Sequence, residues 1–232
     1  DIPMVGRTHL QPAMPSSVGL WASGYAEGLL DDLLTVEAAY AYADRCPLGS
    51  AAGYGVPLPI DRQLTADLLG FATPIHNVFH ASNTRGKCEA IVLGALAQIM
   101  LTASRLAEDL ILFTMPEFGY FALPPELCTG SSIMPQKYNP DVLELIRAKT
   151  ARVLGHQTAV GAILKAMPGG YNRDLQETKE LYLDGVAVTR ATLRILHLMT
   201  QGLTVRPDRL RAGFGPGVFA TDRALELVAS GV

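Results

Sequence analysis

Apolar side chains recur along this chain at intervals of three and four residues, the spacing of one face of an α-helix. The first stripe follows Ser16 and Ser17, both good N-cap residues, and Pro47 closes it. Its apolar members are Trp21, Tyr25, Leu29, Leu33, Val36 and Tyr40. The stripe predicts one long amphipathic helix near the start of the chain.

Further helices are predicted at about 84–115, 139–167 and 174–202, with a short one opening at Asp61. At Asn139-Pro140-Asp141 the chain has an N-cap, a proline at the first helical position and an acid near the positive helix end. Asp174 and Glu177 have the spacing of a capping box, which predicts another helix start there. Smaller elements are expected after Pro207.

The predicted fold class is all-α. Four helices of roughly 25–30 residues would each measure about 40 Å or more, whereas globular helices average about 11–12 residues. Helices this long usually build an extended bundle. The only strand-like fragments are 203–205 and 217–219, and 119–137 is an irregular stretch rich in Gly and Pro.

Composition changes this picture in one respect. Apolar residues make up 49% of the 232 residues and charged residues only 18%, against about 25% charged in an average soluble domain. So low a charge fraction suggests that much of the chain's surface is buried. A chain of this size buries that much surface more easily in an oligomer than alone. The net charge of -3, with no basic stripe, gives no reason to expect nucleic acid or an anionic membrane as a partner.

Cysteine usage and the chain ends bear on localisation. Cys46, Cys88 and Cys128 have no metal-type spacing, which favours reduced thiols in a cytoplasmic protein. The uncharged stretch 90–104 is shorter than the ~20 residues that span a bilayer, so we expect a core helix there. The chain starts without Met or a signal-peptide pattern, and both ends look like cuts through a longer protein.

The segment with the most chemistry is Gly130-Ser131-Ser132-Ile133-Met134-Pro135-Gln136-Lys137-Tyr138-Asn139-Pro140. It predicts a loop that brings two hydroxyls, one ammonium and one amide to a helix N-terminus. Free N–H groups and a positive dipole at that terminus suit a carboxylate or a developing oxyanion. A flexible connector before a capped helix is the simpler alternative. The segment is not a P-loop, because no Gly precedes Lys137 and no Ser or Thr follows it.

Two further polar segments are Gly6-Arg7-Thr8-His9-Leu10-Gln11-Pro12-Ala13 and Gly170-Tyr171-Asn172-Arg173-Asp174-Leu175-Gln176-Glu177-Thr178-Lys179. Taken alone, His9 is more often a solvated bystander than a catalyst, and the second segment is an exposed helix start.

Together the three segments resemble a known family. The loop 130–140 is similar to the signature loop of the fumarase/aspartase superfamily. The segments around His9 and Gln176 resemble the Thr-His-Leu-Gln and Tyr-Asn-x-Asp-Leu-Gln-Glu-x-Lys elements of argininosuccinate lyases. The resemblance covers essentially the whole chain. It implies that 1–207 is the central helical-bundle catalytic domain, without the N-terminal domain, and that 208–232 begins a truncated C-terminal helical domain.

The resemblance implies a cytoplasmic lyase that eliminates fumarate from argininosuccinate and releases arginine, with no metal and no other cofactor. It also implies a homotetramer in which long helices of different subunits pair and the active sites are shared. Because the family's N-terminal domain supplies further substrate contacts, the 232-residue chain alone is expected to be inactive.

The family's functional residues carry over position by position. Ser131 would be the general base, and Lys137 and Asn139 would hold the substrate carboxylate and its aci form. Thr8 and His9 would lie by the leaving group, with Glu144 as the carboxylate partner of His9; the simpler alternative for Glu144 is an acid at a helix N-terminus. The remaining residues implied in substrate binding are Ser132, Arg85, Tyr171, Gln176 and Lys179. Two positions depart from the family pattern: Tyr138 stands where a second Lys is frequent, and Gly86 where an acid often follows the Arg.

Three alternatives remain open on the sequence. The first is another lyase of the superfamily, such as adenylosuccinate lyase or fumarase, which a substrate panel would distinguish from an argininosuccinate lyase. A crystallin-like structural relative would be separated by the activity of the full-length subunit. The third alternative is that this chain is a folded but inactive fragment of an enzyme.

Overall fold

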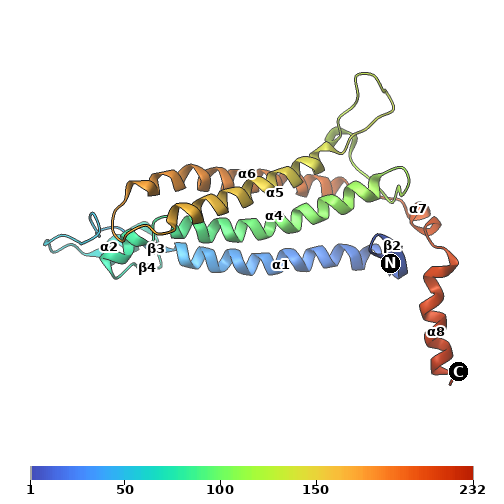
Figure 1. Cartoon of the computed structure of the whole chain (residues 1–232), viewed down its shortest axis with the longest axis horizontal. Helices are drawn as coiled ribbons and strands as arrows, with labels where there is room; N and C mark the ends of the chain where they lie inside the picture. The colour runs from blue at the N-terminus through green and yellow to red at the C-terminus, as the bar shows by residue number, and fades with distance from the viewer. Residues whose placement is uncertain (1, 232) are drawn as a thin grey trace. The chain divides into compact units, whose positions relative to one another are not determined.

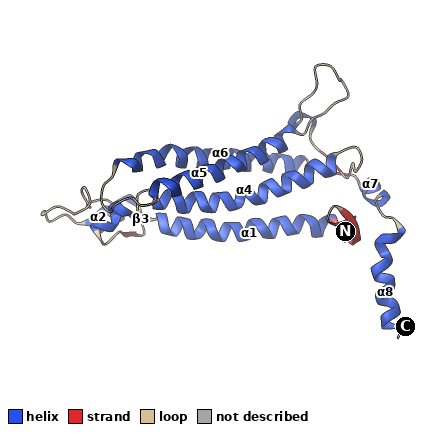
Figure 2. Cartoon of the chain, viewed as in Figure 1, coloured by secondary structure: helices blue, strands red, loops and turns tan. Residues whose placement is uncertain are grey.

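The computed structural model describes residues 2–231, and most of them are helical (Figure 2). The α-helices are α1 (Val18–Ala43), α2 (Arg62–Leu69), α3 (Val78–Asn83), α4 (Lys87–Thr114), α5 (Asp141–Leu164), α6 (Glu177–Gly202), α7 (Pro207–Ala212) and α8 (Ala220–Ala229). Short 3₁₀ turns are η1 (Pro125–Leu127), η2 (Arg173–Gln176) and η3 (Pro216–Phe219). The predicted all-α class with four long helices is confirmed.

The strands are short and form three separate pairs in the described residues. β1 (Pro3–Thr8) and β2 (Gln11–Ser17) make an antiparallel hairpin, β3 (Arg45–Cys46) pairs parallel with β4 (Thr73–Pro74), and β5 (Phe121–Ala122) pairs antiparallel with β6 (Thr204–Val205). The strand-like fragment 203–205 is confirmed as β6. The strand-like fragment 217–219 lies in η3 and forms no strand, and the β1–β2 hairpin was not predicted.

The chain divides into two compact units. Unit 1 comprises Asp1–Leu29, Thr102–Arg147 and Arg194–Val232, and unit 2 comprises Leu30–Leu101 and Ala148–Leu193. Each of α1, α4, α5 and α6 therefore contributes one part of its length to each unit. Within each unit the parts of these four helices run alongside one another (Figure 1).

Unit 1 has an aromatic and aliphatic core. Leu110 of α4, Leu143 of α5 and Met199 of α6 are almost completely buried in it. The α1 side of this core is fixed by Asp109, which accepts hydrogen bonds from Trp21 Nε1 at 2.8 Å and from the Tyr25 hydroxyl at 2.7 Å. Burial, together with the hydrogen bond to the Asp109 carboxylate, raises the pKa of the Tyr25 phenol.

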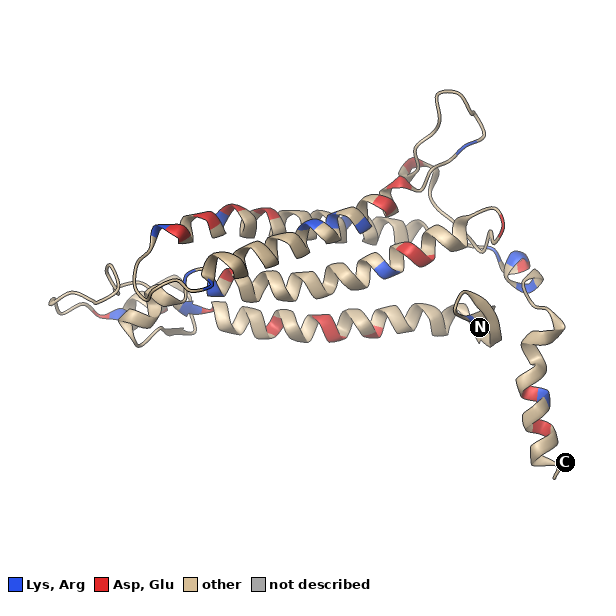
Figure 3. Cartoon of the chain, viewed as in Figure 1, with Lys and Arg blue, Asp and Glu red and all other residues tan. Residues whose placement is uncertain are grey.

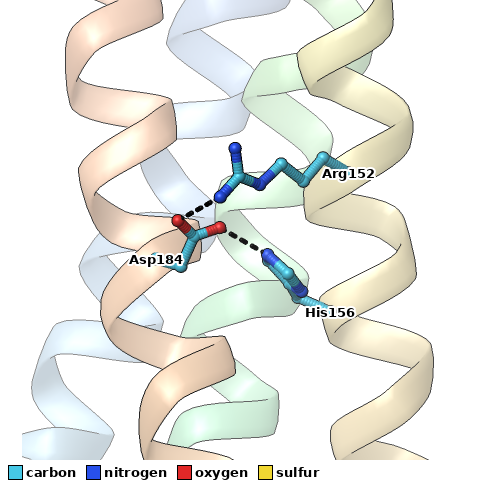
Figure 4. A network of polar contacts seen from close by, with 3 residues as sticks. All are labelled: Arg152, His156 and Asp184. Carbon is cyan, nitrogen blue, oxygen red and sulfur yellow. Dashed lines mark hydrogen bonds and ion pairs between the residues drawn. The ribbon is translucent and has the colours of Figure 1, made fainter.

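Unit 2 has a smaller core of Ala97, Met100, Val153 and Val188. Beside it, Asp184 of α6 accepts hydrogen bonds from two α5 side chains, at 2.6 Å from His156 Nε2 and 2.5 Å from Arg152 (Figure 4). The hydrogen bond from His156, with the neighbouring Arg152, lowers the pKa of the Asp184 carboxyl. The group links α5 to α6 and includes none of the predicted site residues.

The apolar stripe of α1 was predicted correctly only in its first half. Trp21 and Tyr25 face the core, but Leu33 is 47% exposed and Tyr40 is 70% exposed. Asp32 and Ala39 are buried instead. Because α1 is apolar on most of its circumference, the sequence pattern did not distinguish the face that packs within the chain from the faces that do not.

Local capping chemistry sets the starts of α1 and α2. Ser17 Oγ accepts from Leu20 N at 3.0 Å before α1, and Asp61 Oδ1 accepts from Leu64 N at 2.9 Å before α2, as predicted. The predicted start at Thr84 was wrong by three residues, because Gly86 takes a left-handed conformation (φ 74°) that ends one helical segment before the next begins. The predicted cap at Asp174 was also wrong, since that residue lies inside η2.

The helix α4 carries an uncharged stretch over residues 90–104 (Figure 3). By length and composition it is the one helix among the described residues that is apolar enough to cross a membrane, a property that core helices share. Leu93, Ala97, Met100, Ala103 and Ala107 of α4 are fully buried within the chain, as in a core helix.

Candidate active site

His9 lies at the tip of the β1–β2 hairpin, where the chain reverses through His9 and Leu10. Both have positive φ, 53° and 62°, as in a type I′ turn. Such turns favour Asn and Gly, and a residue with a Cβ in this conformation costs about 1–2 kcal/mol. Thr8 and His9 are both exposed. The hairpin therefore presents the two side chains on a strained turn, which is often a property of functional sites.

Arg7 fixes this turn and was not singled out from the sequence. Its Nη1 donates to Leu10 O at 3.2 Å and its Nη2 to the Tyr120 hydroxyl at 3.3 Å. The guanidinium carbon lies 4.8 Å from the centre of the Phe118 ring. Arg7 thus connects the turn that carries His9 to residues 118–120, where the long loop before α5 begins. The only sequence signal for this role of Arg7 is its position directly before the Thr-His-Leu-Gln element.

The loop before α5 extends away from the helices of unit 1 (Figure 1). Its base is closed by a bridge in which Asn139 N donates to Thr129 O at 2.8 Å and Thr129 N donates to Asn139 O at 3.1 Å. The side chain of Asn139 donates to Gly130 O at 3.4 Å and does not cap α5, which begins at Asp141. Within the loop, Ile133 is 86% exposed and Tyr138 is 67% exposed.

Ser131 is half-buried, and its hydroxyl accepts the hydrogen bonds of a local turn in this loop. Its Oγ accepts from Met134 N at 3.1 Å and from Ile133 N at 3.3 Å. Two N–H groups directed at one oxygen favour negative charge on it. Ser132 is exposed.

A cavity of about 950 Å³ lies next to the loop in unit 1. Lys137, Asn139 and Glu144 line it, together with Arg206, which was not predicted. Two cations and one carboxylate in the lining give the cavity walls a net positive charge, which suits an anionic ligand. Ser131 does not belong to the lining, and no hydrogen bond joins His9 to Glu144 in residues 2–231.

In unit 2 the structure brings together three of the predicted substrate-binding residues. Gln176 Nε2 donates to the Tyr171 hydroxyl at 3.4 Å, and the guanidinium carbon of Arg85 lies 4.9 Å from the centre of the Tyr171 ring. The hydrogen bond from Gln176, followed by the contact with Arg85, lowers the pKa of the Tyr171 phenol. Lys179 is exposed on the first turn of α6.

The predicted site residues therefore fall into two groups. Thr8, His9 and the loop residues with Glu144 belong to unit 1, whereas Arg85, Tyr171, Gln176 and Lys179 belong to unit 2. No group of three or more His, Cys, Asp or Glu side chains within residues 2–231 is arranged to hold a metal ion.

Comparison with known proteins decides the family. Residues 1–155, about two thirds of the chain, match the model of a protein family described as lyase. The chain belongs to this lyase family. Curated relatives carry the name argininosuccinate lyase: one from Sorangium cellulosum is 48% identical over all 232 residues, and one from Xylella fastidiosa is 46% identical over 231 residues. The predicted resemblance to argininosuccinate lyases is confirmed.

The lyase chain spans about half the length of these relatives, 54% of the first and 52% of the second. Among solved structures, an EDDS lyase in complex with formate superposes with a TM-score of 0.85 at 28% identity, covering 91% of this chain and 42% of that one. A class II fumarase from Schistosoma mansoni has a TM-score of 0.76 at 19% identity, covering 91% of this chain and 49% of that one, which shows a shared fold.

Proposed function

We propose that the full-length protein eliminates fumarate from argininosuccinate and releases arginine. The observation that carries the proposal is the Ser131 hydroxyl, which accepts two backbone N–H bonds within the loop that also bears Lys137 and Asn139. The two relatives described above carry the name of this activity and match the whole chain.

Proton removal is the first step of the elimination. The deprotonated oxygen of Ser131 takes a proton from the carbon beside a substrate carboxylate and becomes a hydroxyl, and the electrons of the C–H bond move into that carboxylate to give an aci form. A free hydroxyl is a weak base near neutral pH, so its oxygen needs fixed positive potential. The two N–H donors supply part of it, and the ammonium of Lys137 and the start of α5 supply the rest.

The extra charge of the aci form then needs donors of its own. Lys137 and Asn139 line the cavity beside the loop and would hold the carboxylate in both forms. The C–N bond to the guanidinium breaks next, and the electron pair leaves with the nitrogen. Thr8 and His9, at the hairpin tip, would lie by this leaving group, where His9 donates the proton or orients its donor. Glu144 would be the carboxylate partner of His9 when the site is assembled.

The rest of the substrate would be recognised from unit 2. The phenol of Tyr171, the amide of Gln176 and the ammonium of Lys179 form a polar group that fits the amino-acid end of argininosuccinate. Ser132 would add a hydroxyl from the loop. The proposed chemistry needs no metal or organic cofactor, since all its charges are met by side chains and backbone N–H groups.

We further infer that each site is assembled from several subunits of a homotetramer. Support comes from the division of the site residues between two units and from leucines that remain exposed on the long helices. Leu20, Leu30 and Leu34 of α1 are 62–68% exposed, as is Leu183 of α6 at 64%. Light scattering of the full-length protein at micromolar concentration should give the mass of four subunits, and a monomer would contradict the inference.

A substrate panel tests the proposed activity. The full-length protein is incubated with argininosuccinate, adenylosuccinate or malate, and the formation of fumarate is followed at 240 nm. We expect turnover of argininosuccinate with one arginine released for each fumarate. A higher kcat/KM for either of the other substrates, or no turnover of any, would reject the assignment. The domain boundary at residue 207 and the cytoplasmic localisation stay predictions.

A further inference from the structure

The end of α3 and the turn that leads to α4, residues 83–86, pack against the segment that joins α5 to α6. Both belong to unit 2. Asn83 Oδ1 accepts a hydrogen bond from Gly170 N at 2.7 Å. A Cβ at Gly169 would come within 2.7 Å of Cζ of Phe79, in α3, so the backbone there lies directly on that ring. These contacts hold the chain immediately before Tyr171.

The same turn also supports the chain after Tyr171. Gly86 has φ 74°, and a Cβ at this position would lie 2.5 Å from Leu164 Cδ2 and 3.1 Å from Leu175 Cδ2. Leu175 is 4% exposed. It can occupy this buried position because residue 86 is a glycine and has no side chain. This explains one departure from the family pattern, because an acid at position 86 would need both the left-handed backbone and space that Leu164 and Leu175 occupy.

Between these two supports, Arg85 contacts Tyr171 itself. Its guanidinium carbon is 4.9 Å from the ring centre, and Tyr171 is 55% exposed. The phenol oxygen is held from a second direction by Gln176 Nε2. A planar cation over an aromatic face limits the rotation of an exposed ring and keeps its hydroxyl in one place.

We propose that Arg85 is a positioning residue, which orients Tyr171 for the substrate and does not itself bind it. The proposal rests on the proposed function and changes the role that the family resemblance implies for Arg85. Asn83 and Gly86 place the backbone on both sides of Tyr171, and Arg85 places the ring. A direct contact between Arg85 and substrate is the competing account, since Arg85 and Tyr171 both line a cavity of about 630 Å³ in unit 2.

A double-mutant cycle in the full-length protein separates the two accounts. Arg85→Met alone should raise KM about two- to fivefold, the loss expected for one exposed cation–π contact, with kcat nearly unchanged. In a Tyr171→Leu background the same change should have no further effect on KM, because the ring that Arg85 orients is gone. Equal effects of Arg85→Met in both backgrounds would overturn the proposal.

A spectroscopic measurement on the same variants does not depend on lyase activity. The absorbance of tyrosinate at 295 nm is titrated with pH, and the difference from Tyr171→Phe isolates the Tyr171 phenol. Since Arg85 helps to lower the pKa of this phenol, Arg85→Met should shift its titration to higher pH. Arg190→Met, which removes an exposed arginine of α6, is the matched control and should leave the Tyr171 titration unchanged.

The two measurements distinguish a failed positioning role from a failed function. If the full-length protein does not cleave argininosuccinate but the Tyr171 titration shifts, the proposed function fails and the contact stands. If Arg85→Met leaves the titration unchanged, Arg85 does not position Tyr171, whatever happens to activity. Arg85→Lys keeps the charge and loses the planar group, so its KM and its Tyr171 titration should lie between those of wild type and Arg85→Met. It replaces Arg85→Met as the test variant if that protein does not fold.

Discussion

Replacing Ser131 by alanine in the full-length protein is expected to lower kcat by ~10²–10⁴-fold, the usual loss when a general base is removed. KM should change little, because the hydroxyl acts in the transition state and contributes little to ground-state binding. The two backbone N–H groups that now donate to Ser131 Oγ would lose their acceptor, but both lie in an exposed loop where water replaces it.

The control for this variant is Thr129→Val in the same loop. Thr129 pairs with Asn139 through backbone atoms alone, so the change removes a nearby hydroxyl and keeps the bridge. We expect its kcat to stay close to that of wild type. A Ser131→Ala protein that works within a few-fold of wild type, with argininosuccinate as substrate, would show that Ser131 is not the base.

The second large effect concerns the 232-residue chain by itself. We expect its rate of fumarate formation to be on the order of 100-fold or more below that of the full-length subunit. The chain spans about half the length of its curated relatives, so contacts that position the substrate against Ser131 are expected from the remainder. A misplacement of about 1 Å can reduce a rate by about 100-fold.

Unfolding must be excluded as the cause of such a loss. Far-UV circular dichroism should show the same helical signature in the short chain, and light scattering should show whether it assembles. Comparable turnover by a short chain and the full-length subunit would refute the expectation.

The predictable part of the fold depended on local signals. Ser17 and Asp61 are N-caps that act within three residues, so the starts of α1 and α2 could be predicted from the sequence. The β1–β2 hairpin could not, because its turn consists of His9 and Leu10 and lacks the Asn and Gly that usually mark a type I′ turn. Prolines at positions 3, 12 and 15 also disfavour strands.

The candidate site shows the same limit. The loop around Ser131 could be identified because its polar residues are contiguous and precede a helix start. The contacts of Asn83 with Gly170 and of Arg7 with Tyr120 join residues 87 and 113 positions apart. No local pattern encodes contacts at that separation, so their role in placing Tyr171 and His9 appears only in the folded chain.

The central claim is that residues of unit 1 and unit 2 complete one site only when they come from different subunits. Subunit mixing tests it most directly. Full-length Ser131→Ala and Lys179→Met are first assayed separately to establish that each is nearly inactive, and are then dissociated together, reassembled and assayed for fumarate at 240 nm. If the two positions come from different subunits, roughly a quarter of the sites in a random mixture have both native residues, and activity should return to about that fraction. If reassembled hybrids, verified by mass, stay as inactive as the two parents, both residues act within one subunit and the claim is contradicted.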